Sequence, residues 1–167
     1  MQPVKQLWAP WRHAFVAGPR STRCIFCAAK NPRLDRASHV VVRARHAFGM
    51  LNRYPYSTGH VLVAPYRHVA RLEALRLQEW QDIWALAAEL IKRLKREVRP
   101  HGLNVGMNLG RAAGAGIVGH LHLHIVPRWS GDTNFMPVLA GTKVMPQSLE
   151  QLFKVLRRRS ASSQAAS

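Results

Sequence analysis

A run of eleven residues, from Gly119 to Trp129, constrains this chain more than any other segment. In the sequence GHLHLHIVPRW, histidine alternates with an apolar residue, which is the period of a β-strand with one buried face. The apolar positions are predicted to face a hydrophobic core, and they are Leu121, Leu123 and Ile125. The imidazoles are predicted to share the opposite face, about 6.6 Å apart along the strand, and they are those of His120, His122 and His124.

A glycine-rich segment with the sequence GRAAGAGI, residues 110–117, directly precedes this strand. Backbone N–H groups in loops of this kind bind anions. Imidazole has an ordinary pKa near 6.5, so its neutral form can act as a nucleophile at neutral pH and split one displacement into two easier ones. Histidines beside such a loop therefore indicate chemistry on a phosphate. Two alternatives stay open: a metal site made by the three histidines, and a polar strand face without function.

Length and composition predict one domain with a substantial core. The chain has 167 residues, of which 47% are hydrophobic, and we expect a single domain over residues 1–159 with a basic N-terminal arm. Residues 160–167 are polar and small and are expected to form a disordered tail. No apolar stretch approaches the roughly 20 residues of a membrane span, and the first residues do not resemble a signal peptide. These features favour a cytoplasmic protein without membrane contact.

The formal charge of +17 and the scarcity of acids narrow the chemistry. A positive field favours polyanions such as nucleotides or RNA, although a generally basic proteome would give the same composition. Only eight residues are Asp or Glu, and Asp132 alone lies near the histidines in sequence. Paired-carboxylate glycosidase chemistry and carboxylate-held two-metal sites therefore have almost no suitable residues in this chain. Imidazole and backbone groups have to carry any reaction.

The order of predicted elements indicates an α+β domain with an antiparallel sheet. Three short strands are expected early in the chain, over residues 40–45, 47–52 and 60–65. Apolar residues at helical spacing predict a long helix over 77–96, and a strand over 103–108 precedes the glycine-rich loop and the histidine strand. A shorter helix is expected over 147–157.

Two further groups of residues are candidates for binding a metal ion or a substrate. Cys24 and Cys27 form the chain's one C-x-x-C pair; without an export signal, a zinc half-site, a redox pair or two buried reduced cysteines fit better than a structural disulfide. Zinc needs two more ligands, for which His68 and one of the alternating histidines are candidates. Asn52 and His60 flank a turn and could meet a ribose hydroxyl and a phosphate, or serve the turn alone. Asn108 opens the glycine-rich loop.

The chain resembles the histidine triad (HIT) superfamily, whose signature alternates three histidines with apolar residues. The resemblance rests on HLHLHIV at residues 120–126, on GHVLVAP at 59–65, on CIFC at 24–27 and on NRYPYSTGH at 52–60. It is strongest to the bacterial branch related to diadenosine tetraphosphate hydrolases and phosphorylases and to the fragile-histidine-triad hydrolases. It implies a HIT-like α+β fold with about five antiparallel strands, one long helix and a shorter C-terminal helix, assembled as a homodimer.

The resemblance also implies an activity: cleavage of dinucleoside polyphosphates through a nucleotide carried covalently on His122. His120 and His124 would orient this nucleophile and handle protons and phosphate oxygens, and His60 would line the same pocket. Asn52 would meet the ribose. The groups implied near the phosphates are Asn108, Gly114, Ala115, Gly116 and Ile117. The alternatives are a nucleoside phosphoramidase and a non-catalytic basic module that binds nucleotides or RNA.

For the cysteine pair, the resemblance implies a structural zinc ion held by Cys24, Cys27, His68 and His120, and no organic cofactor. As a zinc ligand, His120 would not carry protons, so its two implied roles compete.

Overall fold

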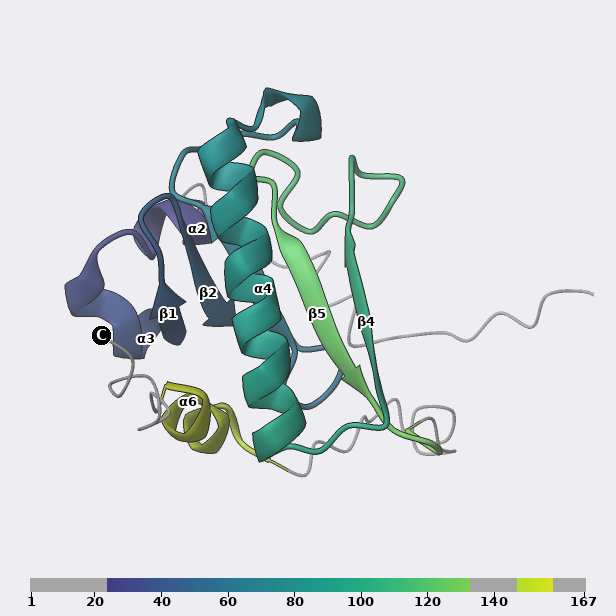
Figure 1. The fold of residues 1–167 in the computed structure, drawn as a ribbon. Helices are drawn as coiled ribbons and strands as arrows, with labels where there is room; N and C mark the ends of the chain where they lie inside the picture. The colour runs from purple at the N-terminus through teal and green to yellow at the C-terminus, as the bar shows by residue number, and fades with distance from the viewer. Residues whose placement is uncertain (1–23, 133–146, 158–167) are drawn as a thin grey trace, which may run out of the picture.

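The structure is a computed structural model that describes residues 24–132 and 147–157 (Figure 1). The expected basic N-terminal arm and the expected disordered tail over 160–167 lie outside the described residues. Within the described part of the chain, no helix combines the length and the apolar character needed to cross a membrane.

A five-stranded antiparallel sheet forms the centre of the fold, in the order β1-β2-β3-β5-β4. The strands are β1 (Val40–Arg43), β2 (Ala47–Leu51), β3 (Val61–Pro65), β4 (Gly102–Met107) and β5 (Leu123–Arg128). The α+β class and the antiparallel sheet are thus confirmed. The register pairs His124 of β5 with Leu62 of β3 on one side and with Gly106 of β4 on the other.

The long helix α4 (Leu77–Glu97) packs across one face of the sheet, and the shorter helix α6 (Leu149–Arg157) lies beside one end of it (Figure 1). Their apolar stripes form the main core with alternate residues of the strands. Members of this core include Ile83, Leu90, Leu94, Leu156, Leu123 and Ile125. The apolar positions of the histidine run are buried, as predicted: Leu121, Leu123 and Ile125.

A smaller core covers the other face of the sheet. It joins Phe26 of helix α2 (Ile25–Ala28) to Phe48, Met50 and Leu62 of the sheet. Because side chains alternate across a strand, the histidines lie on this second face and not beside α4. The short helices α2, η1 (Pro32–Leu34), α3 (Asp35–Ser38) and η2 (Leu72–Ala74) were not predicted, since each has too few residues to show a helical period.

The histidine strand is shorter than its alternating pattern predicts. β5 begins at Leu123, so His120 and His122 precede it. The N–H of Leu121 donates to the carbonyl of Val69, 2.6 Å away, in the segment after β3. This bond takes the chain out of the sheet ladder and holds the segment that carries His68 against the first histidine of the run.

Gly59 fixes the turn that leads into His60. Its φ of +76° lies in the left-handed region, and a Cβ atom there would approach Leu94 Cδ2 to 3.1 Å and Pro127 Cγ to 3.2 Å. Both the backbone conformation and the packing therefore require glycine. Gly102 of β4 differs on both counts, because its φ is not positive and a Cβ atom added there would meet open space.

We expect Gly59→Ala to lower the free energy of unfolding by about 2–3 kcal/mol, from the left-handed backbone and the crowded contacts together. Urea unfolding at neutral pH measures this, with Gly102→Ala as the matched control, expected to change stability by less than about 1 kcal/mol. Equal effects of the two substitutions would contradict the account of the turn.

Candidate functional site

His122 has one ring nitrogen committed to the backbone. Its Nδ1 lies 2.8 Å from the carbonyl oxygen of His120, and since a carbonyl only accepts, Nδ1 carries the proton of the neutral ring. The lone pair is therefore on Nε2. The side chain is 6% exposed, and this burial lowers the pKa of His122 despite the opposing hydrogen bond. The ring is thus a neutral imidazole whose Nε2 carries an unshared electron pair in a fixed orientation.

His60 and His124 form a hydrogen-bonded pair next to His122. The backbone N–H of Tyr56 donates to Nδ1 of His60 over 3.0 Å, so a neutral His60 carries its proton on Nε2. That nitrogen lies 2.9 Å from Nδ1 of His124. Accepting there, His124 carries its own proton on Nε2, and this buried atom has no hydrogen-bond partner in the described part of the chain. His124 therefore presents an unused N–H donor.

A pocket of about 460 Å³ opens beside His124, over strands β4 and β5. The ring of Tyr56 stacks on that of His124 with centroids 5.8 Å apart and planes at 10°, and it forms one wall. Several side chains that line the pocket are polar. The lining residues include Tyr56, Asn104, Gly106, Asn108, Arg128 and Asp132. Asn108 and His124 line the same pocket.

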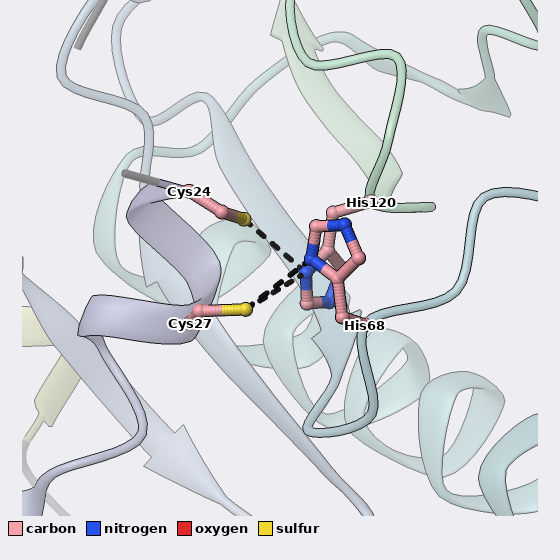
Figure 2. A group of neighbouring side chains, drawn as sticks. All are labelled: Cys24, Cys27, His68 and His120. Atoms are coloured by element: carbon pink, nitrogen blue, oxygen red, sulfur yellow. Dashed lines mark hydrogen bonds between the residues drawn. The ribbon is translucent and has the colours of Figure 1, made fainter. Parts of the chain in front are cut away.

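The four predicted metal ligands lie together (Figure 2), with their ligand atoms within 4.8 Å of one another. Cys24 Sγ is 3.3 Å from His120 Nδ1, and Cys27 Sγ is 3.3 Å from His68 Nδ1 and 3.8 Å from His120 Nδ1. A zinc tetrahedron with bonds of about 2.3 Å to sulfur and 2.0–2.1 Å to nitrogen has sulfur–nitrogen edges of roughly 3.6 Å. The spacing of the cluster fits that geometry.

One further observation supports a metal-binding role for this cluster. His120 Nε2 donates to the carbonyl of Pro65 over 2.9 Å, the kind of bond that orients metal-binding histidines. Burial and the neighbouring Cys24 raise the pKa of the Cys27 thiol, which favours the protonated thiol when no cation is bound. His120 is fully buried and uses both ring nitrogens in these contacts.

The remaining predicted residues make different kinds of contact. Asn52 contacts His60, with Nδ2 and Nδ1 3.2 Å apart. In the glycine-rich loop, the N–H groups of Gly114 and Ala115 donate to the carbonyls of Arg111 and Gly110, so these two amides close the loop on itself. Ile117 packs against the smaller core. Gly116 lies between Ala115 and Ile117 in the sequence.

Sequence reasoning missed two aromatic residues of the site. Phe26, between the two cysteines, packs its ring 5.0 Å from the His120 ring and 4.9 Å from the His122 ring. Tyr56 stacks on His124 and supplies the N–H that orients His60. The spacing of Tyr56, four residues before His60 in a turn, is the signal that could have identified it.

The fold and site define an α+β protein with a cluster of histidines, one of which lines a pocket, on one face of an antiparallel sheet. The family model of the HIT domain matches residues 33–131. The chain belongs to the HIT domain family, and the predicted family membership is confirmed.

Individual relatives agree with this assignment. The chain is 39% identical over 161 residues to a protein of Mycobacterium tuberculosis named AP-4-A phosphorylase, covering 92% of this chain and 83% of the relative. It is 33% identical over 101 residues to a bis(5'-adenosyl)-triphosphatase of Dictyostelium discoideum, covering 60% of this chain and 67% of the relative. A zinc-bound histidine triad family protein from Mycobacterium smegmatis superposes with a TM-score of 0.62 at 25% identity, over 83% of this chain and 93% of the other.

The buried His124 makes stability depend on pH. Burial, and secondarily His122, lower the pKa of His124 to about 4, whereas the unfolded chain has a value near 6.5. The neutral ring stabilises the fold fully above pH 6.5, and this contribution falls as the pH drops toward 4, because the unfolded chain then binds the extra proton.

We expect the wild type to lose about 2 kcal/mol more stability between pH 8 and pH 5 than His124→Gln, which cannot titrate. Urea unfolding at a series of pH values measures, for both proteins, the slope of the free energy of unfolding against pH. His46→Gln controls for loss of a histidine outside the site and is expected to keep the wild-type slope. Parallel slopes for the wild type and His124→Gln would contradict the role of this buried ring.

Proposed function

We propose that this protein cleaves dinucleoside polyphosphates, such as diadenosine tetraphosphate, through a nucleotide carried covalently on His122. The observation that carries the proposal is the fixed tautomer of His122, whose bond to the His120 carbonyl leaves Nε2 with its lone pair. The names of the two curated relatives, AP-4-A phosphorylase and bis(5'-adenosyl)-triphosphatase, support this class of substrate.

In the first step, Nε2 of His122 attacks the α-phosphorus. A nitrogen–phosphorus bond forms as the bond to the bridging oxygen breaks, and the polyphosphate leaves as an anion that needs little protonation. The N–H of His124 donates to an oxygen of the transferred phosphoryl group, where charge develops. Asn108 and the amides of Gly116 and Ile117 assist at the phosphates, whereas those of Gly114 and Ala115 are committed within the loop.

In the second step, an acceptor takes the nucleotide from His122. With diadenosine tetraphosphate, ATP leaves first, and attack by phosphate then gives ADP, whereas attack by water gives AMP. We propose phosphate as the acceptor, on the 39% identity to a protein named a phosphorylase. Hydrolysis is the second candidate, supported by the relative named a triphosphatase.

We expect a product assay with diadenosine tetraphosphate to give ATP and ADP in phosphate buffer. His122→Asn should lower turnover at least about 10³-fold while nucleotide binding persists, since the nucleophile is lost and the pocket is kept. His46→Asn is the matched control, expected to keep wild-type turnover. Undiminished turnover by His122→Asn would contradict the proposal.

The other products of that assay identify the alternatives. AMP in place of ADP indicates hydrolysis. Cleavage confined to adenosine phosphoramidates indicates a phosphoramidase. RNA binding that weakens steeply with salt, without any product, indicates a binding module.

We propose that Cys24, Cys27, His68 and His120 hold one structural zinc ion, which ties helix α2 to the start of the histidine run. All four ligand positions are filled by protein, the arrangement of structural and not catalytic zinc sites. The two free cysteines accord with a reducing, cytoplasmic setting.

We expect about one zinc ion per chain in protein purified without chelators, measured by elemental mass spectrometry. His68→Asn should reduce the content below about half an equivalent, because it removes a ligand, while His46→Asn should retain it. A wild-type content below about half an equivalent would contradict the proposal, as would full retention by His68→Asn.

We also propose that residues 1–159 act as one domain and that two copies associate. Strand β4 is at the edge of the sheet, where its outer N–H and C=O groups are available to pair with another strand. Its Val105 side chain is 40% exposed, which favours an apolar partner. The charge of +17 favours nucleotides and leaves RNA association as a further candidate.

A further inference from the structure

Asn52 holds the ring of His60 from the side opposite to His124. Its Nδ2 lies 3.2 Å from Nδ1 of His60. Its Oδ1 accepts from the backbone N–H of Tyr54 over 2.9 Å. Because the oxygen is committed to a backbone donor, the amide cannot turn over without losing that bond, and the nitrogen must face the histidine.

Two N–H groups therefore donate to the same nitrogen of His60, one from Asn52 and one from the Tyr56 backbone. A ring nitrogen that receives two donors cannot carry a proton of its own. The proton of His60 is then on Nε2, which donates to His124, and the proton of His124 is on Nε2, a buried atom of a ring that lines the pocket. The two donors to Nδ1 of His60 therefore determine the direction of the hydrogen bond between His60 and His124.

We propose that Asn52 is a positioning residue: acting through His60, it holds the His60–His124 pair in the one tautomeric arrangement that offers an N–H of His124 to the substrate. The catalytic part of this inference rests on the proposed function, whereas the tautomers do not. In the reversed pair, Nδ1–H of His124 would donate to the lone pair of His60 Nε2. Nε2 of His124 would then be an acceptor, which repels a phosphate oxygen.

The amide is required, and a carboxylate of the same shape does not replace it. A carboxylate at position 52 can still accept from Tyr54, but its second oxygen would face Nδ1 of His60 as an acceptor. The carboxylate is then satisfied only when Nδ1 carries a proton, which either reverses the pair or makes His60 cationic. The amide keeps the pair uncharged and in its present direction, and His60 is 0% exposed, where a charge is costly.

The chain supplies a matched control for this exchange. Asn31 also accepts, through Oδ1, from the backbone N–H two residues later, that of Arg33, over 3.0 Å. Asn31 and Asn52 thus share the same turn-forming bond, and Asn52 in addition contacts a histidine. Asn31→Asp and Asn52→Asp make the same chemical change in the same local setting.

Nitrogen-15 NMR of the imidazoles reports the tautomers without any substrate. In the wild type at neutral pH, we expect His60 and His124 both to be neutral and protonated on Nε2. In Asn52→Asp we expect Nδ1 of His60 to be protonated, and in Asn31→Asp we expect the wild-type signals. A wild-type His60 protonated on Nδ1, or identical His60 signals in the two Asp variants, would overturn the proposal.

Kinetics with the cleaved dinucleoside polyphosphate supply a second readout. For Asn52→Leu we expect kcat to fall about tenfold, the loss of one positioning hydrogen bond, with KM within about twofold of the wild type. A rise in KM with unchanged kcat would overturn the proposal, because it would assign Asn52 to binding alone. If the wild type cleaves no such substrate, the proposed function fails, and the NMR measurement still decides the arrangement of the pair.

Discussion

The hydrogen bond from the His122 ring to the His120 carbonyl decides which chemistry this site can perform, because it selects the nitrogen that holds the lone pair. Backbone groups orient the neighbouring histidines in the same manner. The Tyr56 N–H fixes His60, and the Pro65 carbonyl fixes His120. Since the positions of these groups follow from the sheet and its turns, the fold itself sets the tautomers, and a shift in the backbone would change the chemistry.

Two cores hold that backbone in place. The larger one, under α4, fixes β3 and β5 through Val61, Leu123 and Ile125. The smaller one carries Phe26 from α2 onto the rings of His120 and His122. The cysteines that flank Phe26 reach His120 as well, so the proposed zinc ion would secure the N-terminal knuckle and the backbone that orients the nucleophile together. A structural metal would in this way influence a reaction that it does not touch.

Local periodicity accounts for what the sequence could predict. Alternation fixed the inward positions Leu121, Leu123 and Ile125, and helical spacing located α4 to within one residue. The motifs of the family brought Cys24, Cys27, His68 and His120 together correctly. Contacts between distant segments could not be predicted: the bond from Leu121 to Val69 that delays β5, the stacking of Tyr56 on His124, and the placement of Phe26. Tautomers were equally inaccessible, because they depend on which backbone group each ring meets.

The central claim is that Nε2 of His122 carries the nucleotide between donor and acceptor, and trapping that species tests it most directly. Enzyme mixed with diadenosine tetraphosphate is quenched under denaturing alkaline conditions, which preserve a phosphoramidate, and the peptide containing His122 is examined by mass spectrometry. We expect one added nucleoside monophosphate on His122, absent from His122→Asn and present in His46→Asn. Continued turnover with no adduct at any time, or an adduct on another residue, would contradict the claim.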